Sequence, residues 1–148
     1  MNIETIKKLV LTDAGFSALA LRFPIAIIFI AHGAQKLFGL FGGYGLEGTG
    51  QWMESIGLAP GYTMALLAGS AEFFGGLALL VGLLVRPAAL VLGITMIIAI
   101  FSVHFANGLF MSANGYEFAL ALLAASVSLM FSGAGKVSLD NVLAKRLA

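Results

Sequence analysis

The sequence predicts an all-α integral membrane protein that forms a single four-helix bundle with short interfacial helices. Apolar residues make up 60% of the 148 residues and charged residues only 10%, whereas soluble domains have roughly 45–50% and about 25%. Four apolar stretches, separated by connectors rich in Gly, Pro or polar residues, are the candidate membrane spans: 17–37, 62–85, 87–105 and 116–131. The 19 glycines suit helices that pack closely in lipid.

The first span, over 17–37, follows a short amphipathic segment, residues 1–16, in which Lys7 and Lys8 accompany apolar side chains. Its apolar run is long enough to cross a bilayer. Arg22 lies near its start, and we expect this side chain to extend to the lipid headgroups.

The connector over 40–61 is rich in Gly, and its middle predicts a short helix over 49–56. Thr49 would be the N-cap and Gly57 the terminator of this helix. Trp52 would lie at headgroup level, as is typical of a helix that lies in the interface.

The second span, over 62–85, is interrupted only by Glu72. Pro87 follows Arg86 in a tight turn and is expected to start the third span, over 87–105, because proline suits the first position of a helix. The third span ends with His104.

The fourth span, over 116–131, follows an uncharged connector and opens with Glu117. The tail after this span contains Ser138, which is expected to be the N-cap of a second interfacial amphipathic helix.

Basic residues divide the connectors into two groups. They occur around the start of the first span, in the second connector and in the tail: Lys7, Lys8, Arg22, Arg86, Lys136, Lys145 and Arg146. Because basic residues favour cytoplasmic loops, the sequence predicts a multi-pass protein of the inner membrane with both termini in the cytoplasm.

Titratable and polar side chains inside the spans are the candidates for function. His32, Gln35 and Lys36 project from one face of the first span, since they lie three and four residues apart. By residue count, Glu72 lies near the bilayer midplane and His32 slightly outside it, whereas three further candidates lie close to the outer interface: Lys36, His104 and Glu117. Gln35 and Asn107 are expected to line the wall between them. Polar groups at this depth are costly unless they face protein or water, so we predict an outward-facing polar pocket with Glu72 at its floor.

We predict that His32 and Glu72 form a catalytic, proton-handling pair in this pocket. The ligand would be bound by Gln35, Lys36, His104, Asn107 and Glu117. An apolar slot beside two proton-competent groups suits a quinone. In the alternative interpretation, the pairs Glu72–His32 and Lys36–Glu117 only hold helices together. No metal site is favoured, because the His and Glu residues lack a local metal-binding spacing and spread over about 10 Å in depth.

Two further function classes remain open at this point. The chain could be a non-catalytic scaffold or assembly subunit of an oxidoreductase complex, or a small-solute transporter, although no span shows the broken helices that mark transport sites. The expected partners are the lipid bilayer, a redox partner protein and further copies of this chain. A net charge of +1 argues against a nucleic-acid partner, and the absence of Cys excludes disulfides and thiolate chemistry.

Several motifs resemble those of the DoxX family of small four-helix membrane proteins, and together they extend over nearly the whole chain. They are His32–Gly39, Gly43–Thr49, Glu72–Leu77, Arg86–Ala89, His104–Gly108, Gly115–Glu117 and Gly133–Asp140. The resemblance implies a four-helix protein of the cytoplasmic membrane. The family is named after a subunit associated with thiosulfate:quinone oxidoreductase, and other members resemble partners in thiol and oxidative-stress systems. The resemblance therefore implies that the chain is associated with redox reactions, but it does not imply that this chain alone is a complete enzyme.

Overall fold

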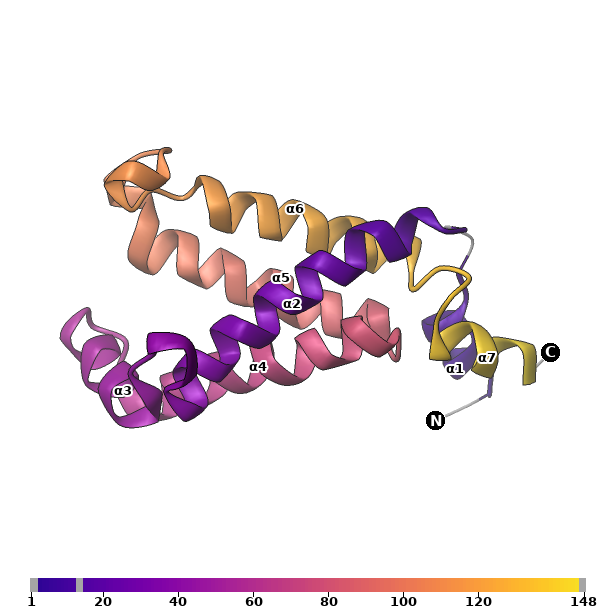
Figure 1. Cartoon of the computed structure of the whole chain (residues 1–148), viewed down its shortest axis with the longest axis horizontal. Helices are drawn as coiled ribbons and strands as arrows, with labels where there is room; N and C mark the ends of the chain where they lie inside the picture. The colour runs from indigo at the N-terminus through magenta and orange to yellow at the C-terminus, as the bar shows by residue number, and fades with distance from the viewer. Residues whose placement is uncertain (1–2, 13–14, 147–148) are drawn as a thin grey trace.

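The computed structural model describes residues 3–12 and 15–146, which form helices joined by turns and loops. The four long helices are α2 (Ser17–Phe38), α4 (Gly61–Val81), α5 (Val85–Ala99) and α6 (Glu117–Ser132). The shorter elements are α1 (Ile3–Val10), η1 (Leu40–Gly42), α3 (Gly45–Ser55), the π-helical turn η2 (Ile100–His104), η3 (Phe105–Asn107), η4 (Met111–Ala113) and α7 (Leu139–Arg146). The long helices form an elongated bundle (Figure 1). The predicted all-α fold class is confirmed.

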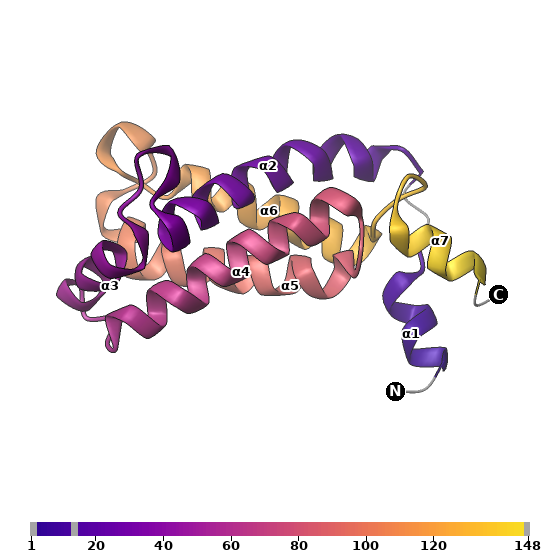
Figure 2. The same cartoon turned by 60° about the horizontal axis from the view of Figure 1, so that its bottom comes forward.

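The two ends of the bundle differ in their contents. Both termini lie at one end with α1 and α7, which we call the termini end (Figures 1 and 2). The helix α3 and the segment between α5 and α6 lie at the opposite end, which we call the loop end (Figures 1 and 2). The prediction that both termini lie on one side therefore agrees with the arrangement of the helices.

Three helices of the described chain are long and apolar enough to cross a membrane: Ser17–Phe38, Gly61–Val81 and the continuous helical stretch Val85–Asn107. The fourth, α6, has 16 residues and rises about 24 Å at ~1.5 Å per residue. That rise is shorter than the roughly 30 Å hydrocarbon core of a bilayer. The bounds of α6 match the predicted stretch within one residue, and its crossing of the bilayer stays a prediction.

Helices α2 and α4 approach each other closely because glycine lies where they meet. A Cβ atom on Gly33 would lie 2.4 Å from the backbone nitrogen of Phe73, and one on Gly76 would lie 2.9 Å from the backbone nitrogen of Ile30. Only residues without a side chain allow backbones to pack at this distance. Helices α5 and α6 pack along each other as a second pair (Figure 1). The apolar core lies between the two pairs.

The sequence-based expectation for Arg22 is wrong, because the side chain is buried at the termini end instead of extending to headgroups. Its guanidinium donates hydrogen bonds to the carbonyl oxygens of Leu79, of Leu80 at 2.8 Å and of Val137 at 2.5 Å. The last carbonyls of a helix have no partner within the helix. Arg22 therefore stabilises the end of α4 and ties it to the tail.

The predicted boundary between the second and third spans is also wrong. Helix α4 ends four residues early, at Val81, because Gly82 adopts a left-handed conformation with φ of 71°. Helix α5 begins two residues early, at Val85. The carboxylate of Asp140 accepts hydrogen bonds from the backbone N–H groups of Leu84 at 2.7 Å and Val85 at 3.0 Å. A residue of the distant tail thus caps the start of α5.

The short helices confirm two predicted end residues and correct a third. Gly57 has φ of 87° just after α3, and the Ser138 hydroxyl accepts a hydrogen bond from the Asn141 N–H at 3.1 Å at the start of α7. Thr49 is not an N-cap, because α3 begins at Gly45 and Thr49 is buried inside it. Packing of α3 against α4 extends this helix beyond what its local sequence predicts.

Candidate functional site

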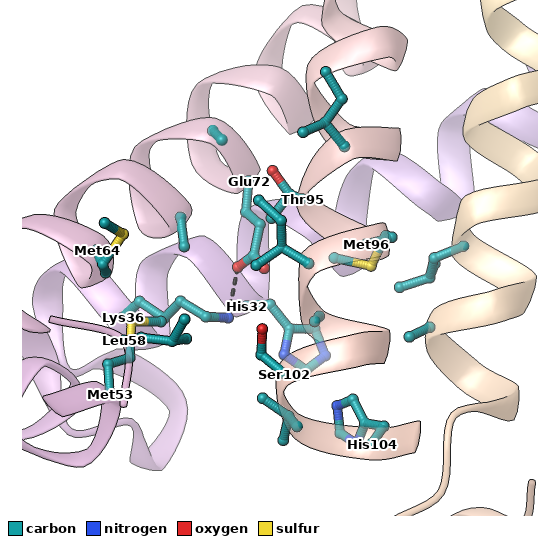
Figure 3. A pocket seen from close by; sticks show the side chains of 18 of the residues that line it. His32, Lys36, Met53, Leu58, Met64, Glu72, Thr95, Met96, Ser102 and His104 are labelled. Carbon is teal, nitrogen blue, oxygen red and sulfur yellow. Dashed lines mark hydrogen bonds and ion pairs between the residues drawn. The ribbon is translucent and has the colours of Figure 1, made fainter. Parts of the chain in front are cut away.

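An ion pair between Lys36 of α2 and Glu72 of α4 lies inside the bundle towards the loop end. The Lys36 Nζ and Glu72 Oε2 atoms are 2.6 Å apart, and the side chains are 23% and 5% exposed (Figure 3). Counting residues places Lys36 nearer the interface than Glu72, yet the two meet. A Cβ atom on Gly69 would lie 3.1 Å from the Lys36 Cβ, so Lys36 of α2 lies beside Gly69 of α4. Gly69 is three residues, less than one helical turn, from Glu72.

This pairing differs from the two structural pairs that the sequence suggested. Glu72 pairs with Lys36 and not with His32, and the carboxylate of Glu117 accepts a hydrogen bond from the backbone N–H of Met111 at 2.6 Å. The close packing of α2 against α4 determines how far one helix is displaced along the other, and therefore which side chains meet. This displacement cannot be obtained by counting residues along each helix separately.

A cavity of about 700 Å³ lies beside the ion pair, between the two helix pairs. This volume is within the usual range for small-molecule sites, roughly 300–1,000 Å³. Most of its wall is apolar, and its polar side chains are His32, Lys36, Glu72, Thr95, Ser102, His104 and Asn114. The prediction of a polar pocket is therefore corrected, because the cavity is mainly apolar and contains only a few polar side chains.

The two histidines line this cavity from different helices (Figure 3). The imidazole of His32 on α2 lies 6.1 Å from the Phe118 ring of α6, centroid to centroid. The Nδ1 atom of His104 lies 2.9 Å from the backbone oxygen of Asn114. His104 belongs to the π-helical turn η2, from which three consecutive residues, Ser102–His104, face the cavity. Such turns occur frequently at functional sites.

The structure does not bring three of the predicted ligand-binding residues, Gln35, Asn107 and Glu117, to the cavity. The amide of Gln35 donates to the Phe41 oxygen at 3.1 Å, and that of Asn107 donates to the oxygens of Val103 and Asn114, each at 3.2 Å. All three side chains instead satisfy backbone groups of the loop end, where helices leave such groups without partners.

Sequence reasoning missed Thr95 and Ser102, which contribute hydroxyl groups to the cavity wall from α5 and η2. The two residues are seven apart in an otherwise apolar stretch, a spacing that places them on one helical face, and this signal could have found them. It also missed the apolar cover at the loop end: Trp52, Met53, Leu58, Met64 and Met111. Trp52 thus lines the cavity, although the sequence predicts it at headgroup level.

The arrangement can bind a mainly apolar molecule that carries hydrogen-bond acceptors. The Lys36 ammonium has three N–H donors, of which one reaches Glu72, and the carboxylate offsets its charge. No cluster of three or more potential metal ligands occurs among residues 3–12 and 15–146.

The chain is similar to proteins of several bacteria. It is 36% identical over 140 residues to "Inner membrane protein YqjF" of Escherichia coli, covering 92% of this chain and 97% of the relative. It is 34% identical over 127 residues to "Putative oxidoreductase CatD" of Bacillus subtilis, covering 86% and 87%. An "Uncharacterized protein" of Haemophilus influenzae is 36% identical over 133 residues, covering 85% and 90%.

No solved structure matches this chain significantly. The sequence pattern of the DoxX family matches residues 17–105, a region that contains α2, α4, α5 and the four ionisable residues of the cavity. The motifs singled out in the sequence, the membrane helices and these similarities agree, and the chain belongs to the DoxX family of membrane proteins.

Proposed function

We propose that this protein is a redox-associated protein of the inner membrane that binds a quinone-class ligand in the cavity beside Lys36 and Glu72. The observation that carries the proposal is the ion pair at the edge of a mainly apolar cavity. Ionisable residues within membrane segments are costly and usually functional. The Bacillus subtilis relative, named as an oxidoreductase, supports a redox role.

Each polar residue at the inner part of the cavity has a role in this proposal. Lys36 donates a hydrogen bond to a quinone carbonyl oxygen, and Glu72 positions Lys36 and keeps the site neutral. Reduction of a quinone to a quinol consumes two electrons and two protons. His32 and Glu72 relay the two protons from the solvent to the quinone oxygens, so the Glu72 carboxylate takes up a proton before it donates one, and a redox partner protein supplies the electrons. His104 lines the cavity towards the loop end.

The test is solvent extraction of gently purified protein, followed by mass spectrometry for bound quinone. We expect quinone in stoichiometric amount with the unmodified chain and its loss with Glu72→Gln. Ser70→Ala is the matched control, because Ser70 lies on the same helix but does not line the cavity. An extract without quinone from the unmodified, folded protein would contradict the proposal.

A second candidate function is a non-catalytic scaffold or assembly subunit of an oxidoreductase complex. The observation that favours it is that the Lys36–Glu72 pair also joins α2 to α4, which alone would explain why both charges are present. In that case the cavity holds no quinone, and the two residues matter for stability only.

We also propose that both termini lie in the cytoplasm. The basic residues outside the spans are concentrated at the termini end, and such residues favour the cytoplasmic side. The Escherichia coli relative is named as an inner membrane protein, which supports the proposal that this chain lies in the inner membrane.

A further inference from the structure

We infer that the ligand reaches the cavity sideways from the bilayer, through an opening between α4 and α5, and that it carries a long apolar tail. This inference rests on the proposed function and specifies its ligand class: quinones with an isoprenoid or alkyl tail that remains in the lipid between these two helices while the ring lies beside Lys36.

Helices α4 and α5 are closed at the termini end and part towards the loop end. A Cβ atom on Gly75 would lie 3.0 Å from the Leu92 Cγ, so the two helices are in contact at this level. Their connecting turn is held by the hydrogen bonds from Leu84 and Val85 to Asp140. From this turn the two helices diverge (Figure 1), and the cavity begins just beyond the Gly75 contact, at Glu72.

The exposed apolar side chains that line the cavity mark its open side. Of the seven large exposed ones among the described residues, four belong to α4 and α5 and are 46% or more exposed at the molecular surface: Leu67, Val91, Ile94 and Ile98. The other three are Phe118 of α6, which is 37% exposed, and Trp52 and Met111 at the loop end, which are 44% and 49% exposed. Phe29 of α2 and Leu122 of α6, which line the cavity from the apolar core, are at most 4% exposed. In a membrane, exposed apolar side chains on spanning helices contact acyl chains, so the cavity opens towards lipid.

Small side chains leave the room between the two helices. Ala68 and Ala71 of α4 and Ala99 of α5 line the cavity on this side, where larger residues would fill the gap. The cavity therefore extends from the ion pair to the exposed apolar side chains of α4 and α5, and alkyl carbon can occupy this part of it.

The loop end offers a less suitable path for a polar ligand from water. Apolar side chains of α3 and the segment after it line the cavity there: Met53 and Leu58, which Figure 3 shows, and Trp52. A molecule that is dissolved in the bilayer avoids this cover. Its polar head can reach Lys36 while its tail stays in an apolar medium.

The fluorescence of Trp52 provides a direct binding assay, because it is the single Trp of the chain and lines the cavity. Quinones quench Trp fluorescence at short range. In lipid nanodiscs we would titrate decylubiquinone, which has an alkyl tail, and ubiquinone-0, which has the same ring without the tail. The variant is Ala99→Phe, which fills the gap, and the control is Ala121→Phe, on the exposed face of α6 away from the cavity.

We expect Ala99→Phe to raise the Kd of decylubiquinone about tenfold, the change produced by 1.4 kcal/mol. The Kd of ubiquinone-0 should change less than about twofold, as should both values in Ala121→Phe. If both quinones bind and Ala99→Phe affects neither, or both equally, the lateral path is wrong while the proposed function stands. If neither quinone binds the unmodified protein, the proposed function fails, and this inference fails with it.

A measurement on the unmodified protein keeps the inference testable if Ala99→Phe does not fold. A quinone with a photoreactive diazirine at the end of its tail would be bound in nanodiscs, irradiated and located by peptide mass spectrometry. We expect labelling on α4 and α5 at Leu67, Ile94 or Ile98. Labelling confined to α2 and α6, or to the loop end, would overturn the lateral path.

Discussion

At the scale of single residues, the charges of Lys36 and Glu72 depend on each other. Glu72→Ala should destabilise the protein by about 3–5 kcal/mol, because it leaves a largely buried ammonium without its partner. Replacing both with Met should recover most of the loss, since a buried ion pair is often no more stable than apolar residues of similar volume. Reversible unfolding of Lys36→Met, Glu72→Met and the double variant in detergent, followed by circular dichroism, measures the coupling of the two sites in a double-mutant cycle.

Glu47→Ala is the control for this cycle, because Glu47 is exposed on α3 and does not line the cavity. Its effect should stay within about 0.5 kcal/mol. A Glu72→Ala variant as stable as the unmodified protein would contradict the pairing. If the double variant is stable and quinone is still extracted from it, the ion pair is not needed for quinone binding. If it is stable but has lost the quinone, the role of the pair is not purely structural.

The sequence identified part of the site at this scale, and the physical reasons are clear. His32, Lys36, Glu72 and His104 could be found because ionisable residues in apolar stretches are rare and must face something polar. Their pairing could not be found, because it depends on how far α2 slides along α4. The side-chain amides of Gln35 and Asn107 donate hydrogen bonds to backbone oxygens at the loop end. These bonds could not be predicted either, because only the folded loops bring those oxygens into place.

At the scale of helices, the contact between α2 and α4 should be sensitive to a single methyl group. Gly33→Ala would place its Cβ 2.4 Å from the backbone nitrogen of Phe73, so the helices must separate, at a cost of about 1–3 kcal/mol. The separation should also lengthen the Lys36–Glu72 contact and weaken quinone binding. Thermal unfolding and quinone extraction measure the two effects.

Gly93→Ala makes the same chemical change where space exists. Its Cβ would lie 3.7 Å from the Leu123 Cδ1 and 3.8 Å from the Ser126 Cβ, which are ordinary contacts. Because Ala is favoured over Gly within helices by about 1 kcal/mol, this variant should be as stable as the unmodified protein or more stable. Equal stability losses in the two variants would mean that the close approach at Gly33 is not real.

The bodies of the helices could be predicted from apolar runs, but some of their ends could not. The start of α5 at Val85 is set by Asp140, which is 55 residues further along the chain. The end of α4 is likewise satisfied by Arg22 of α2. Ends fixed by distant residues leave no local signal. The π-helical turn η2 also has none, although it turns Ser102 and His104 towards the cavity.

At the scale of the whole molecule, composition was sufficient for the class of fold, because a chain with 60% apolar and 10% charged residues is stable only where lipid covers its surface. The divergence of α4 from α5, which creates the cavity, could not be predicted in the same way. It results from glycine contacts at the termini end and small side chains at the loop end, and both act only after the helices have paired.

The orientation of the bundle is testable with single cysteines, because the chain has none of its own. Ser112→Cys lies in η4 at the loop end, and Thr5→Cys lies in α1 at the termini end; both positions are exposed. If the basic termini end faces the cytoplasm, a membrane-impermeant maleimide should label Ser112→Cys in intact spheroplasts and Thr5→Cys only after permeabilisation.

The unmodified chain is the control and should remain unlabelled throughout. The reverse pattern would mean that the termini lie outside, and that the cavity faces the cytoplasmic half of the bilayer. Labelling of both positions in intact spheroplasts would mean that the two ends of the bundle share one side, which is incompatible with helices that cross the membrane along the long axis of the bundle. The expected pattern would instead place the Lys36–Glu72 pair in the outer half, where a quinone bound through the opening between α4 and α5 would have its ring.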